Sequence, residues 1–214
     1  MKFPNAEKGI GKIFAAEILA LIGSICVVAA AIFAALAIGN ENGTMLILAG
    51  VFTIIMAIVT VISYIINIVG IAQASKDEGN HFKTALILTI FGIVFTIVMA
   101  ILGNAFPNNE IVTSLSNTTP DLINLFVMIA IILGVRNLAI QLKDSAVERK
   151  GSNILKVLIC IGIITLVARF VATLITNSVG AVISVIILCV AGILSIVLYV
   201  LYLFYLSKAK KMLK

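Results

Sequence analysis

Charged residues are scarce in this sequence of 214 residues, making up only 11% of it. A water-soluble domain covers its surface with charged and polar side chains, and typical domains carry about 25% charged residues. The few charges here are gathered in short clusters, and the hydrophobic fraction reaches 62%. The composition therefore excludes an ordinary soluble protein and is typical of a membrane protein.

Cysteine and histidine are too few for a disulfide framework or a metal site. Cys26, Cys160 and Cys189 form no CxxC pair and all fall inside apolar stretches, where cysteine behaves as a small hydrophobic residue. His81 is the single histidine, and one imidazole in a charged segment does not make a metal site. We therefore expect no metal and no cofactor.

Motifs of the common catalytic sites are also absent. The sequence contains no HExxH or GxSxG motif and no Walker-type phosphate loop. Hydrolysis within a membrane needs a nucleophile or a metal together with a base, so an enzyme is the least favoured class and we expect no catalytic residues. Basic residues are not interleaved with aromatic ones on a polar face, which excludes a typical nucleic-acid reader.

Apolar runs are what the sequence has in abundance. They reach about 18 residues or more, enough to cross ~30 Å of hydrocarbon as helices. Helices are expected because a backbone in lipid must satisfy its own hydrogen bonds, and the alternation of a β-barrel is absent. We predict a single all-α domain, a polytopic integral membrane bundle of six transmembrane helices, at residues 13–38, 45–74, 84–106, 122–142, 154–176 and 179–206.

Basic residues occur at alternate ends of the predicted helices. They lie at the amino terminus, after the second and fourth helices and in the carboxyl-terminal tail, whereas the intervening polar segments hold none. Because cytoplasmic loops carry the excess of lysine and arginine, we expect both termini on the cytoplasmic side of the plasma membrane. The net charge of +6 comes almost wholly from this side, where lysines would contact anionic lipid headgroups.

The same charges suggest three helical hairpins with both ends in the cytoplasm. A threefold repeat would explain the intervals, but any six-helix membrane protein places charges at similar intervals. The longest polar segment, 104–121, contains no basic residue and is expected to be an outer loop that is either a contact surface or a passive tether. Tyr199, Tyr202 and Tyr205 near the basic tail are expected to anchor the last helix at the headgroup level.

Glu17 and Arg136 form the first candidate site, an intramembrane pair. Counted along their helices, they lie roughly 8 and 10 Å from the cytoplasmic ends, so they share a level. An ion pair between them would neutralise both charges inside the bundle. The alternative is that each side chain extends separately to the cytoplasmic headgroups.

Arg169 is the centre of the second candidate site. A charged side chain inside a lipid-spanning helix costs about 3 kcal/mol on insertion scales, so its surroundings must be polar. Thr165 and Thr173 share its helix face, and the nearest acids are Asp121 and Glu110. We predict an outward-opening polar cleft in which Arg169 pairs with one of these acids, directly or through water. The alternative is an unpaired arginine that extends past the helix end.

Two function classes remain open. One is a non-catalytic scaffold or accessory subunit that binds another polypeptide or a second copy of itself. The other is a small-solute transporter, a channel or a substrate-binding subunit of a transporter. Ion-coupled carriers usually need acidic groups near the midplane and broken helices, whereas the midplane here is almost entirely apolar and no proline interrupts a predicted span. We therefore favour the partner-binding class.

Overall fold

A computed structural model describes all residues except 1, 41–42, 107–108 and 175–177, and within that part it omits the side chains of 39–40, 110–111, 113–114, 117–118, 121, 166–189, 191 and 195. The regular structure of the described ranges is helical throughout, which confirms the predicted all-α bundle. The helices are α1 (Pro4–Asn40), α2 (Gly43–Ala74), α3 (His81–Ala105), α4 (Glu110–Gln141), α5 (Ser145–Leu174) and α6 (Ser178–Met212).

Five of these helices contain a stretch that is long and apolar enough to cross a membrane: Pro4–Ile38, Gly43–Ala74, His81–Ala105, Leu122–Gln141 and Gly192–Met212. Length and composition therefore identify a membrane protein. Many large apolar side chains on these helices face outward, such as Ile25, Ile47 and Ile101, each more than 60% exposed. A soluble protein would not present so much contiguous apolar surface. The fifth predicted span, 154–176, falls largely in α5.

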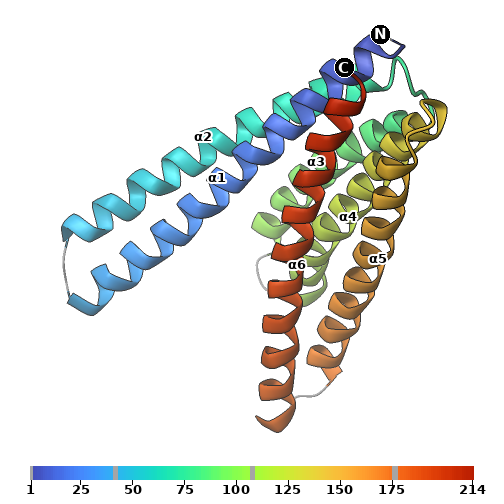
Figure 1. Ribbon diagram of the computed structural model, residues 1–214. Helices are drawn as coiled ribbons and strands as arrows, with labels where there is room; N and C mark the ends of the chain where they lie inside the picture. The colour runs from blue at the N-terminus through green and yellow to red at the C-terminus, as the bar shows by residue number, and fades with distance from the viewer. Residues whose placement is uncertain (1, 41–42, 107–108, 175–177) are drawn as a thin grey trace.

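The helices form three hairpins that meet at one end (Figure 1). The first turns of α1, α3 and α5 and the last turns of α2, α4 and α6 converge there, together with both chain termini. We call this the closed end and the opposite one the open end. Toward the open end the α1–α2 hairpin diverges from the other four helices. Contacts between hairpins are therefore concentrated in the closed half of the molecule.

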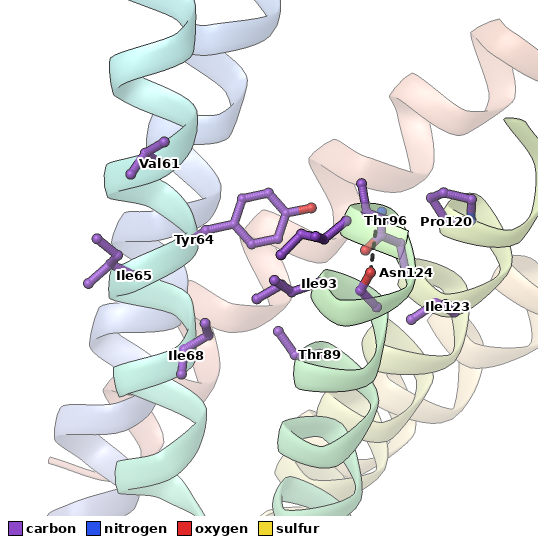
Figure 2. Close-up of a pocket in the computed structure, with 12 residues that line it drawn as sticks. Val61, Tyr64, Ile65, Ile68, Thr89, Ile93, Thr96, Pro120, Ile123 and Asn124 are labelled. Carbon is purple, nitrogen blue, oxygen red and sulfur yellow. Dashed lines mark hydrogen bonds between the residues drawn. The ribbon is translucent and has the colours of Figure 1, made fainter. Parts of the chain in front are cut away.

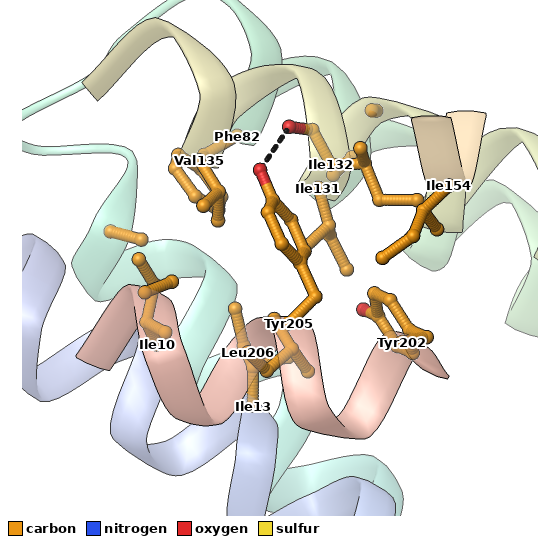
Figure 3. Packing of buried hydrophobic residues seen from close by; sticks show 14 of the residues in the cluster. Ile10, Ile13, Phe82, Ile131, Ile132, Val135, Ile154, Tyr202, Tyr205 and Leu206 are labelled. Carbon is orange, nitrogen blue, oxygen red and sulfur yellow. Dashed lines mark hydrogen bonds between the residues drawn. The ribbon is translucent and has the colours of Figure 1, made fainter. Parts of the chain in front are cut away.

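All six helices contribute to the core of the closed half (Figure 3). Ile10 and Phe82 are fully buried there beside apolar residues of α4, and Tyr202 and Tyr205 of α6 reach into the same cluster. The Tyr205 hydroxyl donates a hydrogen bond of 3.4 Å to the backbone oxygen of Ile132. The expectation that these two tyrosines anchor the helix at the headgroups is wrong, because their rings fill the interior of the bundle.

Glycine allows α1 and α2 to touch backbone to backbone at the closed end. A Cβ atom on Gly9 would lie 2.5 Å from the Gly70 oxygen and 2.6 Å from the Ala74 nitrogen. Two turns further along the pair, the buried Ser63 hydroxyl donates a hydrogen bond of 2.8 Å to the Ala16 oxygen. Small residues of this kind drive helix association in membranes, where apolar side chains gain nothing by leaving lipid.

The other two hairpins also close on a glycine. Gly134 of α4 packs against the Phe82 ring of α3, and Gly151 of α5 packs against the Tyr205 ring of α6. The segment before α3 also contains a glycine, Gly79, but it lies in a turn, where the nearest neighbour of an added Cβ atom would be the Ser75 oxygen at 3.9 Å. The threefold repeat stays a prediction.

The prediction of an outer loop over 104–121 is wrong for most of its length, because α4 begins at Glu110 and continues through Pro120. The Asn109 side chain caps this start, since its Oδ1 accepts a hydrogen bond of 3.2 Å from the Val112 amide. Asparagine before an acidic residue is a helix-start signal. We did not predict this helix start, because the segment is polar in composition. Pro120 removes one backbone hydrogen bond from the helix but does not end it.

Candidate functional site

The turn between α2 and α3 ties three helices together through two carboxylates. Asp77 accepts hydrogen bonds of 2.8 Å from the Asn5 side chain and 2.8 Å from the Ala6 amide. A carboxylate at the first turn of a helix also interacts favourably with the helix dipole. Asp77 therefore fixes the start of α1 against the end of α2.

Glu78 is the more deeply placed of the two, with only 3% of its surface exposed. Its Oε2 accepts hydrogen bonds from the His81 and Phe82 amides at 3.0 and 3.1 Å, which caps α3. Its Oε1 accepts a hydrogen bond of 3.0 Å from the Asn137 side chain of α4. We did not predict a role for Glu78 from the sequence. The signal was an acid a few residues ahead of an apolar run, which is typical of a helix amino terminus.

Glu17 and Arg136, predicted as a pair, have different partners in the structure. The Tyr199 hydroxyl of α6 lies 2.8 Å from Glu17 Oε2 and 2.7 Å from the Glu17 backbone oxygen. Arg136 lies 3.8 Å from the Glu148 carboxylate of α5. Glu17 thus joins α1 to α6 and Arg136 joins α4 to α5. Within the described part of the chain no ion pair links Glu17 to Arg136.

Several buried polar atoms in the closed half have no hydrogen-bond partner among the described residues. They come from α2, α4 and α6, and each costs about 1 to 3 kcal/mol if it stays unpaired. Together with Glu17 they place polar groups within the mostly apolar interior of the closed half. These atoms are Asn67 Oδ1, Gln73 Oε1, Arg136 Nε and the Tyr202 hydroxyl oxygen.

A groove of about 350 Å³ lies between α2 on one side and α3 and α4 on the other (Figure 2). It sits where the α1–α2 hairpin leaves the rest of the bundle, and branched apolar side chains form most of its walls. Its lining comprises Val61, Tyr64, Ile65, Ile68, Thr89, Gly92, Ile93, Thr96, Ile97, Pro120, Ile123 and Asn124.

The groove offers few hydrogen-bonding groups. The hydroxyls of Thr89 and Thr96 donate to carbonyl oxygens one turn back in their own helix, at 2.8 and 2.9 Å. Tyr64 and Asn124 are exposed on opposite walls and bond to no other described residue. Their hydroxyl and amide are therefore free to bind an occupant. No sequence pattern predicted this groove, because its walls come from three helices and it forms where α2 diverges from α3 and α4.

The predicted cleft around Arg169 cannot be assembled from the described side chains. Those of Arg169, Thr173, Asp121 and Glu110 lie outside them. Thr165 is described, and its half-buried hydroxyl donates a hydrogen bond of 2.9 Å to the Ile161 oxygen of its own helix. The cleft stays a prediction.

The described residues include no cluster of His, Cys, Asp and Glu able to hold a metal ion. No protein-family model, curated protein or solved structure matches the chain.

Proposed function

We propose that this chain is a non-catalytic membrane protein that binds a transmembrane helix of another polypeptide in the groove between α2 and α3–α4. The observation that carries the proposal is a largely apolar groove, within membrane-length helices, whose two walls present the free Tyr64 hydroxyl and the free Asn124 amide. Such a surface suits a partner that is itself apolar but has an occasional polar group.

The chemistry of the groove favours a helix over the other apolar occupants. An acyl chain would leave the Asn124 amide without a partner, and an unpaired amide in an apolar medium is costly. A side chain or a small-residue backbone of a neighbouring helix can bind that amide, as polar residues do between membrane helices. A small polar solute would need several converging polar groups, which the lining of the groove does not supply.

The location that we propose is the plasma membrane, with the closed end and both termini in the cytoplasm. The basic clusters at the closed end support it, because lysine and arginine are retained on the cytoplasmic side. In a cysteine-free background, Ser116→Cys should react with an impermeant maleimide added to intact cells and Gly79→Cys should not. Labelling of Gly79→Cys but not of Ser116→Cys would show that the protein has the opposite orientation.

Site-specific photo-crosslinking tests the groove. A benzophenone amino acid at Ile65 or Ile97, on opposite walls, should give a polypeptide adduct of discrete mass in native membranes. Ile54 and Ile90 are matched controls, because they are similarly exposed but outside the groove. They should give only diffuse lipid adducts. Equal polypeptide crosslinking at all four positions, or none at any, would contradict the proposal.

Asn124→Leu separates a helix partner from lipid in the same groove. Loss of one interhelical hydrogen bond costs about 0.6 to 2 kcal/mol in membranes, so retention of the partner should fall by roughly three- to thirtyfold. An acyl chain would bind the more apolar variant at least as well. Partner retention after mild-detergent purification, measured by quantitative mass spectrometry, distinguishes the two.

A second candidate function, a small-solute carrier, is favoured by the unpaired polar atoms of the closed half. Asn67, Gln73 and Arg136 contribute such atoms from helices on different sides of the bundle, and Glu17 adds an ionisable group. Ionisable residues inside membrane helices often mark solute or proton pathways. This function predicts solute-dependent proton flux in proteoliposomes that Glu17→Gln abolishes, whereas the partner-binding function predicts none.

A further inference from the structure

A second cavity lies between α5 and α6 at the closed end, with a volume of about 260 Å³. Its two ends differ in chemistry. One end has the amino groups of Lys150 and Lys208 and the amide of Asn153, while the other is apolar. The full lining is Lys150, Asn153, Ile154, Val157, Leu201, Phe204, Tyr205 and Lys208.

The two lysines bring like charges together from different helices. Lys150 and Lys208 line the same cavity. The contact with Lys208 and the Lys208 charge, then desolvation and the Arg149 charge, lower the pKa of the Lys150 amine. Neither lysine has a carboxylate partner among the described residues. Two ammonium groups so placed repel each other, and a bound anion would relieve that repulsion.

The apolar end of the cavity continues toward the membrane-spanning part of the helices. Val157, Leu201 and Phe204 leave 43%, 44% and 65% of their surfaces exposed along this side. Phe204 belongs to the apolar stretch Gly192–Met212. A ligand that fills the whole cavity must therefore carry an anionic group at one end and a hydrocarbon at the other.

We propose that this cavity binds an anionic membrane phospholipid, with its phosphate between Lys150 and Lys208 and an acyl chain along Val157, Leu201 and Phe204. The phosphate oxygens accept hydrogen bonds from both ammonium groups and from Asn153. The site is separate from the groove between α2 and α3–α4 and does not depend on a polypeptide partner there.

The test uses the full-length protein in nanodiscs or mild detergent with phosphatidylglycerol or phosphatidylcholine as probes. Native mass spectrometry should show a retained phosphatidylglycerol that phosphatidylcholine does not replace. The double variant Lys150→Gln with Lys208→Gln should bind phosphatidylglycerol roughly tenfold more weakly, since each lysine near an anionic headgroup contributes measurably. Lys150→Arg with Lys208→Arg should retain most of the binding.

The control variant is Lys211→Gln with Lys214→Gln, which removes the same charge from exposed positions outside the cavity. It should change binding by less than about twofold, because only the nonspecific attraction of the basic end is reduced. Equal losses in the two double variants would show nonspecific attraction and overturn the proposal. Unchanged binding after loss of Lys150 and Lys208 would also overturn it.

Phe204→Asn distinguishes a phospholipid from free phosphate as the source of the anion. It leaves the lysines in place, so phosphate binding should survive, whereas the acyl chain loses its largest apolar contact and phosphatidylglycerol retention should fall. Inorganic phosphate should compete only at concentrations far above those of the lipid. Two results together would overturn the lipid assignment: competition by phosphate at a concentration equal to that of the lipid, and unchanged phosphatidylglycerol retention in Phe204→Asn.

Discussion

The closed and open halves of the molecule are built from similar helices but hold together differently. In the closed half, glycines bring together the two helices of each hairpin, and buried tyrosines and hydrogen-bonded carboxylates join one hairpin to another. In the open half, the α1–α2 hairpin stays paired, for example through the Phe33 and Phe52 rings stacked at 5.5 Å, but it diverges from the other helices.

The difference shows which contacts can hold helices together in lipid. Isoleucine, valine and leucine pack as well against acyl chains as against each other, so a purely apolar face gives no strong preference for a neighbouring helix. Close backbone approach and hydrogen bonds do give a preference for a neighbouring helix over lipid. The groove exists where α2 faces α3 and α4 with apolar side chains and no pair of small residues joins the walls.

The largest effect is expected from breaking the backbone contact between α1 and α2. Gly9→Ala places a Cβ atom against backbone atoms of Gly70 and Ala74, which cannot rotate away, so the helices must separate. The expected loss is about 3 kcal/mol, at the upper end for overpacked sites. Thermal unfolding in mild detergent, followed by circular dichroism, measures it.

Gly50→Ala is the matched control for that prediction. Gly50 also lies inside a helix, but nothing occurs within 4 Å of the position where its Cβ would be. Alanine favours helix over glycine, so the variant should be unchanged or slightly more stable. A loss at Gly50 equal to that at Gly9 would mean that the closed end has no special role in stability.

Glu78→Gln should give the next largest effect. The substitution keeps the size of the side chain but weakens the cap of α3 and the bond to Asn137, and hydrogen bonds to charged groups contribute about 1.5 to 3 kcal/mol. We expect a loss of about 2 kcal/mol. Glu148→Gln removes a carboxylate that is 38% exposed and 3.8 Å from Arg136, so it should cost less than about 1 kcal/mol. Equal losses would contradict the assigned role of Glu78.

Helix existence could be predicted from the sequence because the apolar runs are long and the charges between them are clustered. The second predicted helix, 45–74, differs from α2 by two residues at its start and ends at the same residue. The start of α4 was missed by more than ten residues, since Asn109 and Glu110 form a helix start within a polar segment that has no apolar periodicity. Local capping outweighed composition there.

Side-chain partners were harder to predict, because depth along a helix says nothing about the direction in which a side chain points. Glu17 and Arg136 have matched depths but bond to Tyr199 and Glu148. Glu78 was missed for a related reason. Its burial depends on Asn137, which is 59 residues away in the sequence, and no local pattern reports that contact.

The smallest expected effect concerns the repulsion between Lys150 and Lys208 at the closed end. Because Lys208, and to a lesser extent Arg149, lower the pKa of Lys150 from 10.5, the folded protein binds fewer protons than the unfolded chain between the two pKa values. Stability attributable to Lys150 should therefore rise with pH through that interval. In a nonionic detergent, Lys150→Gln should be slightly more stable than the parent at about pH 8, and the difference should shrink toward about pH 10 as the amine loses its proton. Added phosphatidylglycerol should remove the difference at the lower pH, because the phosphate neutralises both ammonium groups. A difference in unfolding temperature that stays constant across this range would mean that the two lysines do not repel each other in the folded state.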